Sequence, residues 1–108
     1  AVPEPEGAAV DAALRIIHHW ARARLAIIEP KADFTANALG YDADDVFSLL
    51  LTVDRSCVFD VSPDHAFPER TVLEMKVATG EALLYVKVSL RLDKDYNVKV
   101  LSFKRYGT

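Results

Sequence analysis

The sequence has few cysteines, glycines and histidines, and each shortage excludes a class of site. A single cysteine, Cys57, forms no internal disulfide and suits a reducing compartment, which predicts a cytoplasmic location. The four glycines form neither a GxGxxG nor a Walker phosphate-binding loop. Three histidines and one cysteine are too few and too scattered to hold a metal ion, so we expect no metal and no cofactor.

Long apolar runs and an excess of positive charge are also missing. The longest apolar candidate, Val46–Val53, is far shorter than the ~20 residues that span a membrane, so no membrane partner is expected. The net charge is −3, so nucleic acid binding would require a local basic patch. The 108 residues predict a single domain over residues 8–108, after a mobile leader over residues 1–7 that is rich in proline and glutamate.

Hydrophobic periodicity predicts helices in the first half of the chain. In the second of them, Phe34 and Ala38 are expected to form the apolar pair. Asp42 is the expected N-cap of the third, with Asp45 at the position of a capping-box acid. The helices are expected over residues 8–25, over residues 31–39 and from residue 42 to about residue 53.

The first predicted helix also carries a polar stripe. Arg15, His18, His19 and Arg22 recur at spacings that place them on one face. Two interpretations stay open: a solvated face opposite the core, or a basic face that binds phosphate or an acidic partner.

From Ser56 onward the periodicity changes to two, which predicts strands. Alternation in the third strand predicts that Val86 and Val88 are buried and that Lys87 and Ser89 are not. Residues 93–97 are expected to form a hairpin loop, and helices are expected to cover the apolar face of a mainly antiparallel sheet. The fold class is therefore α+β. The strands are expected at residues 56–61, 70–77, 83–92 and 98–104.

Basic and phenolic side chains gather on the predicted strands. Metal-free RNA cleavage needs groups of these kinds: a base that takes the proton of the 2′-hydroxyl, a cation that stabilises the phosphorane and an acid that protonates the leaving 5′-oxygen. Neighbouring cations are expected to lower the pKa of Tyr85. The alternative interpretation is the ordinary wet face of a strand. The residues concerned are Arg70, Lys76, Tyr85, Lys87, Arg91, Lys99, Lys104, Arg105 and Tyr106.

From about Thr35 onward, three stretches in order resemble the MqsR family, the toxins of a bacterial type II toxin–antitoxin system. Ala38–Asp42 (ALGYD), followed by the apolar segment Val46–Val53, resembles the family's LGLD segment and the helix after it. Thr79–Val88 (TGEALLYVKV) resembles its TGxVYLK strand, and Val100–Lys104 (VLSFK) resembles its C-terminal VSFK. The resemblance implies a RelE-like fold and a ribosome-independent mRNA endonuclease that a cognate antitoxin protein neutralises.

The resemblance also implies site residues. Tyr85 takes the place of the family's catalytic tyrosine and Lys104 that of its catalytic lysine, while His65, in an Asp-His pair, borders the site and Arg70 is a candidate substitute for the family's glutamine. Phe59 and Asp60 stand where the family has Tyr-Lys. The expected RNA-binding residues are Lys76, Lys87, Arg91 and Arg105.

Two functions from different classes therefore remain. The first is an mRNA endonuclease toxin, which the matches at Tyr85, Lys87 and Lys104 favour. The second is a non-enzymatic binding protein on the same scaffold, either an inactive relative or a toxin-neutralising protein. The departures from the family pattern and the net negative charge of the chain favour this second function.

Overall fold

The computed structural model describes residues 6–93 and 98–107, which form helices on a five-stranded sheet. The strand order is β1-β5-β4-β3-β2, and every neighbouring pair is antiparallel except β1 with β5, which is parallel. The predicted α+β class is confirmed. The elements are α1 (Glu6–Arg22), β1 (Ile27–Ile28), α2 (Pro30–Ala38), α3 (Ala43–Leu50), a 3-10 turn (Arg55–Cys57), β2 (Val58–Pro63), β3 (Thr71–Ala78), β4 (Leu83–Leu90) and β5 (Lys99–Arg105).

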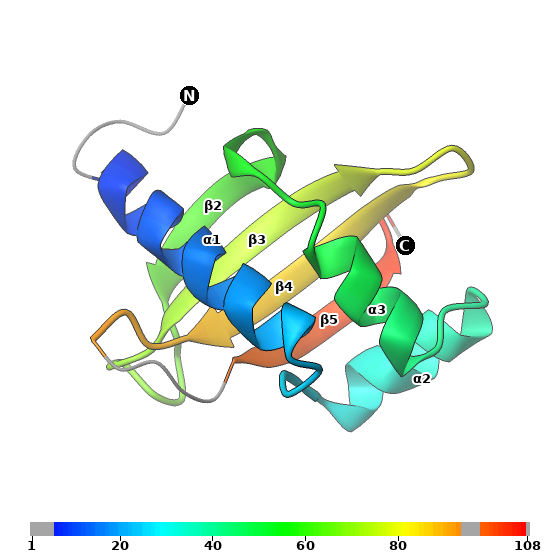
Figure 1. Ribbon diagram of the computed structural model, residues 1–108, viewed down its shortest axis with the longest axis horizontal. Coiled ribbons are helices and arrows are strands. Elements are labelled where there is room, and N and C mark those ends of the chain that lie inside the picture. Colours follow the sequence, from blue (N-terminus) through cyan, green and yellow to red (C-terminus); the bar gives the residue numbers. More distant parts are fainter. Residues whose placement is uncertain (1–5, 94–97, 108) are drawn as a thin grey trace.

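Helices α1 and α3 lie on one side of the sheet and bury its apolar face (Figure 1). The alternation in β4 holds as predicted for Val86 and Val88, which have no exposed surface. They pack in one core with the apolar stripe of α1, represented by Val10 and Ile17. Among the described residues, no helix is long and apolar enough to cross the bilayer.

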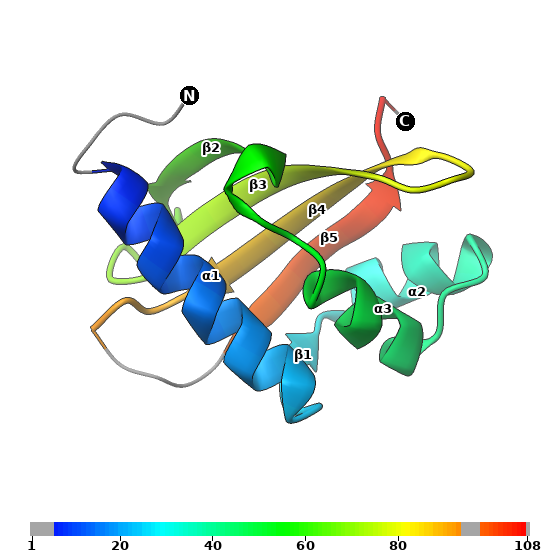
Figure 2. The same ribbon diagram turned by 45° about the horizontal axis from the view of Figure 1, so that its top comes forward.

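Helix α2 lies beside β5 and covers the edge of that strand (Figure 2). Ala32 and Ala36 are fully buried, and the Thr35 hydroxyl donates to the backbone oxygen of Phe103. The predicted apolar pair is wrong: Phe34 is 77% exposed, and Ala38 is exposed as well. The small side chains of the two alanines let α2 pack against β5, so they form the buried stripe of the helix.

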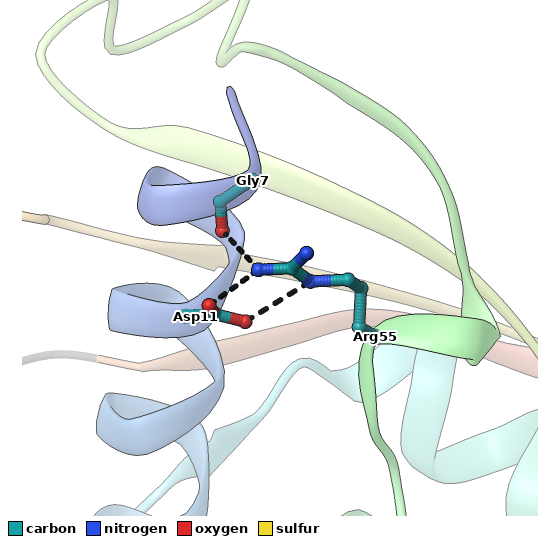
Figure 3. Close-up of polar contacts among 3 residues, drawn as sticks. All are labelled: Gly7, Asp11 and Arg55. Carbon is teal, nitrogen blue, oxygen red and sulfur yellow. Dashed lines mark hydrogen bonds and ion pairs between the residues drawn. The ribbon is translucent and has the colours of Figure 1, made fainter. Parts of the chain in front are cut away.

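Polar contacts fix the N-terminal parts of α3 and α1. The predicted capping box of α3 is confirmed: the Asp45 N–H donates to Asp42 Oδ1 (2.8 Å) and the Asp42 N–H donates to Asp45 Oδ2 (3.0 Å). Arg55 ties the first turn of α1 to the turn before β2 by donating to the Asp11 carboxylate and to the Gly7 carbonyl (3.1 Å; Figure 3).

Several predicted boundaries are wrong. Helix α1 begins at Glu6, so residues 6 and 7 belong to it and not to the leader, whose residues 1–5 lie outside the described part of the chain. Strand β4 ends at Leu90, two residues earlier than predicted. The short strand β1 was not predicted, because two residues carry no periodicity. Residues 94–97 of the expected hairpin loop lie outside the described residues.

Candidate functional site

The sheet face opposite α1 and α3 carries the candidate site. Among the described residues no helix covers this open face (Figure 2). Backbone pairing sets Lys76 of β3 opposite Tyr85 of β4, and Tyr85 opposite Lys104 of β5. Since directly paired residues point to the same face, these three side chains form one row across three strands. The structure thus brings together three residues that the sequence placed in the site.

Two exposed aromatic rings extend this row. Phe59 on β2 is 45% exposed, and Tyr106 just after β5 is 41% exposed. Lys76 Nζ lies 5.0 Å from the ring centroid of Phe59 and 4.5 Å from that of Tyr106, within the range of cation–π attraction. Lys104 Nζ lies 5.5 Å from the Tyr85 ring. We call Phe59, Lys76, Tyr85, Lys104 and Tyr106 the lysine–aromatic cluster.

A shallow depression of about 410 Å³ opens beside this cluster, and we call it the lysine depression. Lys31 at the start of α2 contributes to it although it lies far from the strands in sequence, because α2 is packed along β5. Among the residues that the structure describes, the lining contains no carboxylate, so it favours an anion. It consists of Lys31, Tyr85, Lys87, Ser102, Lys104, Tyr106 and Gly107.

Tyr85 is held in its protonated form. Burial, the hydrogen bond that its hydroxyl donates to Glu74, and the negative charges of Glu74 and Asp60 all raise its pKa well above the ordinary value for tyrosine. The prediction that neighbouring cations lower this pKa is therefore wrong. Lys104 lies over the Tyr85 ring, whereas the carboxylates of Glu74 and Asp60 act on the hydroxyl.

A second depression of about 410 Å³ adjoins the first and shares Lys87 with it. His65 lies on its rim and is exposed, as expected for a residue bordering the site. Its other polar groups include Asp60, Asp64 and Glu74, so its charge is the reverse of that in the lysine depression. The open face is consequently basic over β5 and α2 and acidic over β2 and the adjoining part of β3.

Arg70 does not join this site. It is 6% exposed, its Nε donates to Ser89 Oγ (2.7 Å) and its guanidinium also donates to the Ser89 carbonyl (2.9 Å). Ser89 in turn donates to Asp64 (2.9 Å). Ser89 is four residues from Tyr85 along β4, or about 13 Å at ~3.3 Å per residue. Arg70 therefore anchors the loop between β2 and β3 at the far end of the open face.

The same network explains why the prediction of an exposed Ser89 is wrong. Ser89 is 1% exposed, because residues 64–70 fold over this end of the sheet. Phe67 in that loop lies beside Lys99, whose Nζ is 5.7 Å from the ring centroid.

The expected RNA-binding residues lie in three places. Lys76 and Lys87 lie on the open face, as described above. Arg91 lies beyond the end of β4 and forms a two-bond ion pair with Asp93 (2.8 and 3.0 Å). Arg105 follows Lys104, so alternation directs it to the other face, and together with Lys104 it lines a groove of about 310 Å³ between β5 and α2.

Sequence reasoning missed several members of the site. Glu74 alternates with Lys76 on β3, so the period-two pattern was the signal that places it on this face. Phe59 departs from the family pattern, which gave no reason to expect its ring in the site. Lys31 carried no signal, because its position depends on how α2 packs.

Metal ligands are not assembled: no group of three or more histidine, cysteine or acidic side chains suited to a metal ion occurs within residues 6–93 and 98–107. Comparisons with protein-family models, with curated proteins and with solved structures returned no match to this chain.

Proposed function

We propose that this protein is a metal-independent mRNA endonuclease with a RelE-like fold, the toxin of a type II toxin–antitoxin system. The row Lys76–Tyr85–Lys104 carries this proposal, together with the adjoining depression, whose described lining holds further lysines and no carboxylate. It is the kind of site that binds a phosphodiester. The resemblance to the MqsR family in Thr79–Val88 and Val100–Lys104 supports RNA as the substrate, a cognate antitoxin as the partner and the cytoplasm as the location.

The proposed reaction needs no water and no metal. The 2′-oxygen of one nucleotide attacks the neighbouring phosphorus and forms a new P–O bond, while the bond from phosphorus to the 5′-oxygen breaks. The proton of the 2′-hydroxyl passes to a base, and an acid protonates the departing 5′-oxygen. The products are a 2′,3′-cyclic phosphate and a 5′-hydroxyl end.

The protonation states suggest how the groups divide this work. Because its pKa is raised, Tyr85 keeps its proton at neutral pH and suits the role of acid toward the leaving oxygen. The Glu74 carboxylate, which accepts the Tyr85 hydrogen bond, is the nearest group that can take a proton. Lys104 and Lys87 would stabilise the negative charge that grows on the phosphorane.

The decisive experiment is cleavage of a long mRNA by the purified chain in EDTA. Wild type should cut the RNA, and Lys104→Ala and Tyr85→Phe should each slow cleavage by about 10²-fold or more. Both side chains are half-buried, so Tm must be measured for each variant. Phe34→Leu, which changes an exposed aromatic on α2, is the matched control and should cut like wild type.

In cells, induced expression of the chain should arrest growth, and Lys104→Ala should relieve the arrest. An inert wild-type protein in EDTA, or variants as fast as wild type, would overturn the endonuclease proposal.

One observation favours the alternative of a non-enzymatic binding protein. The Tyr85 hydroxyl is occupied by Glu74, and the acidic depression adjoins the lysine depression, so the face presents both charges as a protein-binding surface does. RNA or a protein partner that is bound but not cut would support this alternative.

A further inference from the structure

We propose that RNA lies on the open face in one orientation, with its sugar–phosphate backbone over β5 and α2 and an unpaired base at Phe59 and Tyr106, stacked face to face on one ring and edge-on to the other. This inference rests on the proposed function, because it takes RNA as the ligand. It assigns Lys31 as a phosphate contact and the two exposed rings as a base-stacking subsite.

Lys31 and Lys104 mark the backbone side. They come from different elements and line the same depression, in which none of the described lining residues is acidic. Their relative position is fixed, because Ala32 and Ala36 pack α2 along β5 and Thr35 bonds to the carbonyl of Phe103. Because the backbone positions of the two lysines are fixed, their side chains can reach neighbouring phosphates without a rearrangement of α2 against β5.

Phe59 and Tyr106 mark the base side. Both rings are nearly half exposed, and their centroids are 6.3 Å apart with the planes at 87°. Lys76 lies close to both rings and helps to hold them in place. Nucleobases stack on exposed aromatic rings of this kind in proteins that bind single strands, and a neighbouring cation assists the binding.

The charge pattern of the face decides between the two possible orientations. Asp60 and Glu74 line the depression on the β2–β3 side, where they repel a phosphate. With the backbone over β5 and α2, the phosphates meet the lysines of the lysine depression, and only the phosphate that is cleaved comes close to Glu74. The less charged base then lies toward Asp60. The reverse orientation would set phosphates against Asp60 and Glu74.

Binding of a short single-stranded RNA with 2′-O-methyl groups tests this orientation, because its blocked 2′-oxygens prevent cleavage. Affinity is measured by fluorescence anisotropy over a range of salt concentrations. Lys31→Ala should weaken binding and lower the slope of log K against log salt by about one contact. It should also weaken binding of inorganic tripolyphosphate.

The double variant Phe59→Leu, Tyr106→Leu should respond differently. It should weaken RNA binding by about 10-fold or more at every salt concentration, with an unchanged salt slope. Tripolyphosphate and an abasic oligonucleotide should bind to it as they bind to wild type. Phe34→Leu and Arg15→Ala, which change an exposed ring on α2 and a cation on α1, are the matched controls and should change neither quantity.

The orientation is overturned if the aromatic double variant binds RNA like wild type, or if it loses tripolyphosphate in the same proportion as RNA. Either result, with wild-type RNA cleavage intact, leaves the proposed endonuclease standing. If RNA is bound as expected but never cut, the orientation stands and the endonuclease proposal fails. A wild-type chain that binds no RNA overturns both.

Discussion

The Tyr85 hydroxyl donates a hydrogen bond to the carboxylate of Glu74 on the neighbouring strand. Glu74 lies two residues before Lys76, the residue that pairs directly with Tyr85. This bond places the hydroxyl near negative charge even though Lys76 and Lys104 flank the tyrosine along the row. Burial and this diagonal neighbour, and not the direct partners of Tyr85, therefore keep the tyrosine protonated.

Glu74→Gln should bring the pKa of Tyr85 down toward the ordinary tyrosine value. The charge and the carboxylate acceptor are lost while burial remains, so part of the upward shift should persist. Absorbance of the phenolate as a function of pH measures the change, with Tyr85→Phe identifying which transition belongs to Tyr85. If the pKa of Tyr85 is the same in Glu74→Gln as in wild type, Glu74 is not a cause of its upward shift.

The raised pKa of Tyr85 also predicts how the stability of the fold changes at alkaline pH. A phenol whose folded-state pKa is raised stabilises the fold below the unfolded pKa, about 10, and this contribution is lost as the pH rises above that value. Tyr85→Phe should thus flatten the decline in unfolding free energy above about pH 10. Urea unfolding at several alkaline pH values measures it, with Tyr106→Phe as the control. An unchanged decline in Tyr85→Phe would contradict the linkage.

Asp64→Asn should weaken the fold at neutral pH and remove part of its acid sensitivity. Burial acts to raise the pKa of Asp64, but hydrogen bonds from Ser89 and from the N–H groups of Ala66 and Phe67, with the charge of Arg70, outweigh it and hold the pKa below the ordinary value. Such a carboxylate stabilises the fold above its unfolded pKa of about 3.9, and the contribution is lost as the pH falls through the lower folded pKa.

The expected cost of Asp64→Asn at neutral pH is about 1–2 kcal/mol, the scale for losing charged hydrogen bonds. Denaturant unfolding from neutral pH to about pH 2 measures it, and the two curves should converge at the acid end. Asp33→Asn on α2 is the control, because its side chain accepts only one exposed bond, from Asn37 (3.3 Å). Parallel curves for wild type and Asp64→Asn would contradict the prediction.

Much of the fold was predictable because it depends on local patterns. The alternation around Val86 and Val88 and the capping box at Asp42 need only neighbours in sequence, and both are confirmed. The errors occur where distant segments meet. Ser89 is buried by a loop that crosses the sheet, and Phe34 is exposed because α2 packs through alanines.

The candidate site, like the fold, was predictable where it depends on local patterns and not where it depends on contacts between distant segments. Strand pairing brought Lys76, Tyr85 and Lys104 together, since period-two alternation and a hairpin meander leave few possible registers. The pKa of Tyr85 was predicted in the wrong direction, because the identity of the atom nearest its hydroxyl depends on side-chain geometry. Lys31 enters the site through helix packing, about which its sequence neighbours carry no information.

Val88→Asp should unfold the domain. Val88 has no exposed surface and lies in the centre of the core beneath the helices. An unpaired buried carboxylate costs several kcal/mol, comparable with a total stability of ~5–15 kcal/mol. Circular dichroism and Tm measure the effect. Leu83→Asp, at an exposed position of the same strand, is the control and should remain folded.

Charge reversal on α1 should leave RNA binding unchanged, which favours the solvated-face interpretation of its polar stripe. Arg15 and Arg22 are exposed on the helix that covers the other side of the sheet. His18 belongs to the fold, because its Nε2 lies 2.8 Å from the Val53 carbonyl oxygen and links α1 to the chain after α3. The stripe is thus not a continuous basic surface.

The variant Arg15→Glu, Arg22→Glu tests this at about 0.15 M salt, where the screening length is about 8 Å and charges behind the sheet contribute little. Affinity for the 2′-O-methyl RNA and its salt slope should both match wild type, whereas Lys104→Ala in the same assay should reduce both. Weaker binding with a flatter salt slope in the α1 variant would place RNA on the helix side of the molecule. That result would contradict the open sheet face as the RNA site, because the short RNA of this assay cannot contact the open face and the arginines of α1 at the same time.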